Sequence, residues 1–174
     1  MRFGGIVVAA LLLVGACSSD PTPEEPDPTR SATPTPTATP PPMPDQAKED
    51  TPEGAAAFVQ HYVDVFNYAA ATGDVEELSA LSSPDCEGCQ SYIELYRKTY
   101  EAGGYFKGGE WKIGKLEMEQ SRKSRRIFAH LDAPAGRQLE RAGGQVGPTT
   151  PEDAELIFVV GRATGVVETL SRTS

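Results

Sequence analysis

Histidine and cysteine are scarce in this chain, and their scarcity limits the chemistry that the protein can perform. There are two histidines and three cysteines, and no further Cys or His pair joins Cys86 and Cys89 to complete a four-ligand zinc site. The sequence also lacks a nucleophile elbow, a phosphate-binding glycine loop and an HExxH helix. It therefore identifies no catalytic residue, no metal ligand and no cofactor.

Positive charge and long apolar runs are also in short supply. The chain has 16 Lys and Arg against 25 Asp and Glu, a formal net charge of −9. This charge argues against nucleic acid as a partner and against general adhesion to anionic lipid. The apolar run from Ile6 to Val14 is too short to cross a hydrocarbon core of ~30 Å.

The first sixteen residues have the layout of a secretory signal peptide. Arg2 precedes the apolar run, and two small residues then lead to Cys17. This ending resembles a lipobox, the signal of bacterial lipoproteins. The resemblance implies cleavage before Cys17, acylation of that residue by diacylglycerol and palmitate, and a lipid anchor on the extracytoplasmic face of the cell membrane. A plain signal peptide, in which Cys17 has no role, is the alternative.

Residues 17–50 differ in composition from the rest of the chain. Proline and threonine dominate them, and aromatic residues are absent. Such a segment buries too little apolar surface to offset the entropy of ordering it. We therefore expect a disordered linker, extended by its prolines, that lifts a folded domain away from the bilayer.

Residues 51–174 have the right length for one domain, and three helices are predicted in its first half. The first spans residues 52–72, between the capping residues Thr51 and Gly73. A capping box at Asp74 predicts a short second helix. The third is predicted to begin at Ser83 and to end at a Gly-Gly pair.

After the third helix, the spacing of apolar residues changes to two, which is typical of strands. Four strands are predicted, over residues 111–118, 127–131, 156–160 and 166–170. A slip in the alternation near Gly114 predicts a β-bulge. Residues 134–153 are rich in Gly and Pro and are predicted to be a long loop. Helices followed by an antiparallel meander indicate an α+β fold.

Several segments of the domain resemble a family of actinobacterial lipoproteins of unknown function. The resemblance rests on Thr51–Phe58, Tyr68–Asp74, Cys86–Cys89, Gly103-Gly104 and Gly108–Trp111. Domains of that family are similar to the cone-shaped fold of nuclear transport factor two and polyketide cyclases. The resemblance thus implies three helices packed on a curved antiparallel sheet, and it allows a homodimer through the outer sheet face. It supplies no activity and no catalytic residue.

The two cysteines of the Cys86–Cys89 motif are expected to form a disulfide, because thiols outside the membrane are oxidised. Their spacing lets them meet across the first turn of the third helix, and the small ring contributes only about 2 kcal/mol. A structural staple is the first interpretation. A redox site is the alternative, because a helix N-terminus lowers the pKa of a thiol.

Aromatic residues suggest a candidate ligand pocket between the helices and the sheet. Its predicted members are Tyr62, Phe66, Tyr92, Tyr96, Trp111 and His130; ordinary core packing is the other interpretation. His61 is expected to be partly exposed on the flank of the first helix. His130 alternates with Ala129 and Leu131, so it should lie on the opposite face of the sheet. Asp64, Asp132 and His130 are the candidate general bases.

A basic run, Arg122–Arg126, is predicted to form the solvated tip of a hairpin. The alternative is a contact with anionic headgroups or wall polymers.

Three functions remain open from these observations. The first is a non-enzymatic binding module of the cell envelope, whose partner is an envelope protein or a small apolar ligand. The second is a small cyclase- or isomerase-type enzyme that uses a pocket carboxylate or His130. The third is a structural domain that contacts the wall. A buried carboxylate in a cavity would favour the enzyme, an apolar cavity a carrier, and a filled core a protein-interaction surface.

Overall fold

The computed structural model describes residues 38–173. The predicted signal peptide, Cys17 and the predicted linker as far as residue 37 lie outside the described residues. The described part is α+β, with three helices packed on antiparallel sheets. The helices are α1 (Pro52–Thr72), α2 (Glu76–Ala80) and α3 (Glu87–Glu101), preceded by the short 3-10 helix η1 (Asp45–Lys48). None of the described helices is both long and apolar enough to span a membrane.

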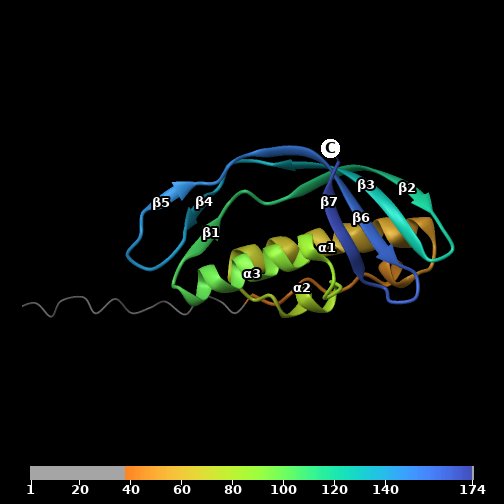
Figure 1. The fold of residues 1–174 in the computed structure, drawn as a ribbon, viewed down its shortest axis with the longest axis horizontal. Helices are drawn as coiled ribbons and strands as arrows, with labels where there is room; N and C mark the ends of the chain where they lie inside the picture. Colours follow the sequence, from red (N-terminus) through yellow and green to blue (C-terminus); the bar gives the residue numbers. More distant parts are fainter. Residues whose placement is uncertain (1–37, 174) are drawn as a thin grey trace, which may run out of the picture. The chain divides into compact units, whose positions relative to one another are not determined.

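A four-stranded sheet with the order β2-β3-β6-β7 covers the helices (Figure 1). Its strands are β2 (Lys112–Gln120), β3 (Ser124–Ala133), β6 (Glu152–Gly161) and β7 (Val167–Arg172). The pairing of β2 with β3 shifts register between Ile113 and Leu116, so the predicted bulge near Gly114 is confirmed. Figure 1 shows α1 and α3 on one side of this sheet.

A second, three-stranded sheet was not predicted. It has the order β1-β4-β5, with β1 (Tyr105–Lys107), β4 (Arg137–Leu139) and β5 (Val146–Pro148). The prediction of one long loop over residues 134–153 is therefore wrong. The β1–β4 pair and the β2–β3 pair are both antiparallel. Because β1 directly precedes β2 and β4 directly follows β3, the short sheet continues the β2–β3 hairpin beyond a kink. Gly108 and Gly109 form this kink, with φ of 71° and 78°, angles that favour glycine.

The first helix begins and ends where the sequence predicts. Thr51 caps α1 by accepting a hydrogen bond from the Gly54 N–H at 2.9 Å. Gly73 ends it in the left-handed region, with φ 78°. A Cβ at Gly73 would also collide with the ring of Tyr100, so both conformation and space require glycine there.

The other two helices begin later than predicted. Asp74 accepts from the Glu76 N–H at 3.1 Å, and α2 starts at Glu76. The third helix starts at Glu87, after Cys86, so the predicted start at Ser83 is wrong. Ser83 is instead held against the sheet, where its N–H donates to the Val167 carbonyl at 2.8 Å. Local capping chemistry could not reveal this long-range bond.

Residues 38–50, which the sequence assigned to the linker, pack on the domain. We call this segment the strap. It contains η1, buries Ala47 and packs Met43 against the core. At one end the Tyr68 hydroxyl donates to the Ala38 carbonyl at 2.9 Å. The strap therefore runs along α1 as a structured part of the domain.

Candidate functional site

Four of the six predicted pocket residues, Phe66, Tyr92, Tyr96 and Trp111, form a packed aromatic cluster together with Phe106, which was not predicted. Phe66 is its centre: its ring stacks on Trp111 with centroids 4.0 Å apart and meets Tyr92 and Tyr96 edge-on at 4.9 and 5.4 Å. Phe66 is 1% exposed and Trp111 is 9% exposed. The rings occupy the space in which a ligand was expected, so the alternative of ordinary core packing describes them better.

Asn67 fixes Trp111 in this cluster. Its side-chain amide donates to the Trp111 carbonyl at 2.8 Å, and its carbonyl oxygen accepts from the Trp111 N–H at 2.8 Å. The side chain thus pairs with the backbone just before β2 as a neighbouring strand would. The sequence analysis missed Asn67, since nothing in the sequence reports a contact across 44 residues.

Tyr62 lies apart from the cluster and contacts Phe158 of β6, with ring centroids 5.9 Å apart. Ser82 donates to the Leu78 carbonyl at 2.7 Å, so the Tyr62 hydroxyl is the donor in its 3.0 Å bond to Ser82. Burial raises the pKa of Tyr62 to about 12, an effect that the Ser82 bond only partly offsets. The phenol therefore stays protonated at neutral pH and has a structural role.

The candidate general bases are all at the surface. His130 faces outward from β3, as predicted, and its side chain is 46% exposed. Its Nδ1 lies 3.1 Å from Glu155 Oε1. Asp64 and Asp132 are also exposed. The inclusion of His130 among the pocket residues is therefore wrong, because it lies on the opposite face of the sheet from the aromatic cluster. Among residues 38–173, no group of three or more His, Cys, Asp or Glu side chains is arranged to hold a metal ion.

His61 is buried, which corrects the prediction of a partly exposed side chain. It is 2% exposed, and its Nε2 has no hydrogen-bond partner among the described residues. Gly54 approaches the strap so closely that a Cβ would collide with the Glu49 carbonyl, and Tyr68 bonds its other end. His61 lies seven residues after Gly54 and seven residues before Tyr68, so all three are on the same face of α1. The strap therefore passes along the helix face that carries His61.

Burial lowers the pKa of His61, against the opposing charges of Asp64 and Glu77. The imidazole is thus neutral at pH 7 in the folded protein.

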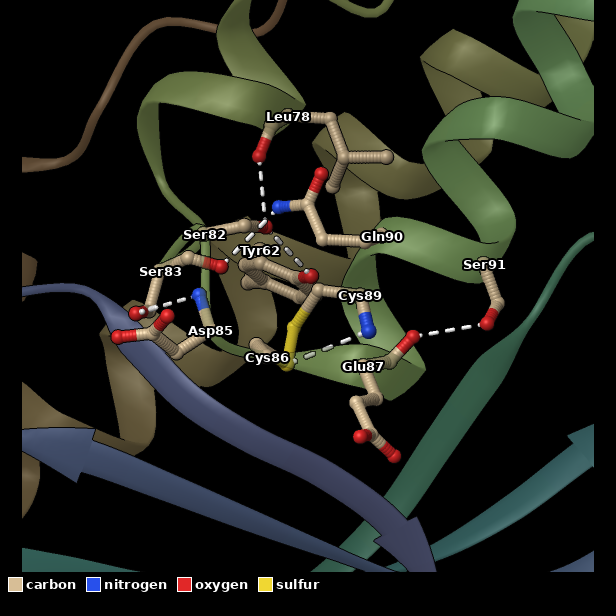
Figure 2. Close-up of a disulfide and its surroundings, with 10 residues drawn as sticks. All are labelled: Tyr62, Leu78, Ser82, Ser83, Asp85, Cys86, Glu87, Cys89, Gln90 and Ser91. Atoms are coloured by element: carbon tan, nitrogen blue, oxygen red, sulfur yellow. Dashed lines mark hydrogen bonds between the residues drawn. A yellow bond between two sulfur atoms is a disulfide. The ribbon is translucent and has the colours of Figure 1, made fainter.

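Cys86 and Cys89 form the predicted disulfide, with Cα atoms 5.2 Å apart. Figure 2 shows it at the first turn of α3, where the Cys86 sulfur accepts from the Cys89 N–H at 3.2 Å. Both cysteines are 1% exposed, and Gly88 between them packs on the Leu170 carbonyl of β7. Burial hinders attack by an external thiol, which favours the structural staple.

A shallow groove of about 300 Å³ lies beside this disulfide, between the start of α3 and β7. Its lining residues are Asp85, Glu87, Gly88, Glu168, Thr169, Leu170 and Ser171. None of the predicted pocket residues lines it. Asp85, Glu87 and Glu168 give the groove an acidic lining, so it does not suit a small apolar ligand.

The basic run is divided between a turn and a strand. Arg122 and Lys123 are exposed, but Arg125 belongs to β3 and is 5% exposed. The prediction of a solvated tip over the whole run is therefore wrong. Arg125 Nη2 pairs with Asp50 Oδ1, and Asp50 Oδ2 lies 2.6 Å from Arg162 Nη2. The strap is thus tied to two hairpin ends at once.

One signal for Arg125 was present in the sequence. It precedes Ile127, Ala129 and Leu131 at a spacing of two, and these three side chains are buried. Alternation places Arg125 on the same face. Asp50 and Arg162 gave no comparable signal, because their pairing depends on how distant segments meet.

Fold and site together define a small α+β domain with a filled aromatic core and a structured N-terminal strap. A family profile described as a family of unknown function (DUF6318) matches residues 28–146. The chain belongs to this family, which confirms the expected membership of a family of unknown function. The match includes the strap.

A solved structure with a similar fold is the intermembrane space region of the chloroplast protein ARC6. Its TM-score is 0.52 at 10% sequence identity, and the alignment covers 72% of this chain and 98% of that chain. At this identity the likeness concerns the fold alone. No curated protein matches the chain.

Proposed function

We propose that this protein is a lipid-anchored lipoprotein of the actinobacterial type, held on the extracytoplasmic face of the cell membrane. In this proposal its cone-type domain, similar to nuclear transport factor two, is a non-enzymatic module that binds an envelope protein through its surface. The lipobox-like sequence before Cys17 supports the location. The Cys86–Cys89 disulfide fits an oxidising compartment.

The observation that carries the binding proposal is the packing of the aromatic cluster. Phe66 contacts both Tyr96 and Trp111, and the three side chains are between 1% and 9% exposed. A carrier of a small apolar ligand needs an apolar cavity, and an enzyme of the cyclase or isomerase type needs a base inside one. The candidate bases are exposed, so a surface-binding function is favoured over both alternatives.

The anchor is tested by replacing Cys17 with Ala. We expect the variant to leave the membrane fraction and to incorporate no labelled palmitate, because the acylated sulfur is removed. Ser18→Ala is the matched control and should stay in the membrane fraction with its label. A Cys17→Ala protein that remains membrane-bound to the same extent would contradict the lipid anchor.

The surface-binding function is tested by native mass spectrometry of the mature chain isolated from its own host. We expect the polypeptide without any retained small molecule, because the aromatic rings fill the core. A stoichiometric apolar ligand that survives purification would overturn the proposal in favour of a carrier.

A further inference from the structure

Two hairpin ends meet beside the strap and concentrate positive charge there. The Arg162 N–H, in the β6–β7 turn, donates to the Lys123 carbonyl of the β2–β3 turn at 3.0 Å. Arg125 points inward from β3 next to them, with its side chain only 7% exposed. This end is basic in a chain whose formal net charge is −9.

Asp50 is the counter-ion of both Arg125 and Arg162, and one carboxylate does not neutralise the two guanidinium groups. Its two carboxylate oxygens each take one guanidinium, so two positive charges face one negative charge. Arg125 Nε is buried and has no hydrogen-bond partner among the described residues. Burial and the charge of Arg162 both lower the pKa of Arg125, as expected where cations are not fully compensated.

A larger anion would satisfy the pair better than one carboxylate does. A phosphate group offers more oxygen acceptors, and guanidinium groups bind it through two parallel N–H donors. Asp50 does not block the approach, because its side chain is 62% exposed. Stability alone does not explain the arrangement, since a buried ion pair is often no more stabilising than apolar residues of similar size.

We propose that Arg125 and Arg162 form a binding site for a phosphate group, and that the Asp50 carboxylate occupies this site in the free protein. An arriving phosphate displaces Asp50, and its oxygens then accept from both guanidinium groups and from Arg125 Nε. No covalent bond forms or breaks. The site is independent of the lipid anchor and goes beyond the proposed function.

The test is a phosphate titration of the mature chain carrying Cys17→Ala, followed by NMR of the arginine Nε–H signals. Inorganic phosphate is the probe. Asp50→Asn should bind it at least ten-fold more tightly than the parent, because the competing charge is gone. Arg162→Gln, added to Asp50→Asn, should remove this gain. This variant changes a turn residue, so it keeps the test independent of any folding defect caused by replacing Arg125.

Arg126→Gln, also added to Asp50→Asn, is the matched control. Arg126 is next to Arg125 in β3, but it is 55% exposed and pairs with Glu119 at 3.6 Å. It should leave phosphate binding unchanged. Equal losses from Arg162→Gln and Arg126→Gln would show general charge attraction and overturn the site. An unchanged affinity in Asp50→Asn would also overturn it.

Vesicles identify the source of the phosphate group. Binding of Asp50→Asn to phosphatidylglycerol vesicles, lost with Arg162→Gln and absent with phosphatidylcholine vesicles, would support the site with a lipid headgroup as its ligand. Binding of inorganic phosphate without vesicle binding would support it with a free phosphate or phosphoester as the ligand.

Discussion

Phe66→Ala is expected to lower the free energy of unfolding by about 3–5 kcal/mol. Phe66 is 1% exposed and contacts three other rings, so the substitution removes a large buried side chain and leaves a cavity that its neighbours fill only in part. Urea denaturation of the disulfide-bonded chain measures the loss.

Leu95→Ala is the matched control for this prediction. Leu95 is a large apolar residue of α3, but it is 41% exposed, so its loss should change stability by no more than about 0.5 kcal/mol. The comparison separates burial in the aromatic cluster from a general effect of shortening side chains.

The same variant distinguishes a core from a ligand pocket. If the aromatic rings lined a ligand site, Phe66→Ala would reduce ligand binding with only a small change in stability. A loss below about 1 kcal/mol would therefore contradict the filled core. That result would favour a carrier of a small apolar ligand over a surface-binding function.

Sequence reasoning succeeded where the determining interactions are local. The limits of α1 follow from Thr51 and Gly73, and both act within one turn of the helix. The bulge in β2 shows in the alternation of β2 itself. The disulfide also joins residues three apart. In each case the cause and its effect lie in the same short segment.

Sequence reasoning failed where distant segments determine the result. Helix α3 begins later than predicted because the Ser83 N–H donates to the Val167 carbonyl. Strands β4 and β5 have three residues each, too few to show an alternation. They form because β4 pairs with β1 and β5 pairs with β4. The strap has few apolar residues, yet α1 buries Ala47.

The candidate site followed the same pattern. The aromatic residues belong to the core, but spacing cannot tell a filled core from a lined cavity. That distinction depends on packing distances between α1, α3 and the start of β2. The inward orientation of Arg125 could be predicted from the alternation of buried residues in β3. Its ion-pair partners, Asp50 and Arg162, could be identified only from the tertiary structure.

Removal of the strap is expected to cost about as much stability as the loss of Phe66. A chain that begins at Thr51 lacks Asp50, so the buried Arg125 loses its ion-pair partner. Breaking a fully buried pair costs about 3–5 kcal/mol, and this pair contributes less because the Asp50 side chain is 62% exposed. The truncation also exposes the surface that Ala47 and Met43 cover. A chain that begins at Ala38 keeps these contacts and is the matched control for this truncation.

The two histidines supply a second measurement that does not depend on the unfolding transition. Burial lowers the pKa of His61 from its ordinary value of 6.5. The unfolded chain therefore takes up a proton at a higher pH than the folded chain does. The stability from the neutral imidazole is complete above pH 6.5 and is lost as the pH falls through the folded-state pKa. Without the strap, the pKa of His61 should rise toward 6.5 and this loss should shrink.

His130 is the internal spectroscopic control, because its exposed side chain lies on the outer sheet face, away from α1. Its ring resonances, compared at one fixed pH, should be the same in the chains that begin at Ala38 and at Thr51. A Thr51 chain with unchanged stability and an unchanged His61 titration would show that the strap is not part of the folded domain. A shift of His61 alone, together with lower stability, would establish residues 38–50 as a structural element of the domain rather than the end of its linker.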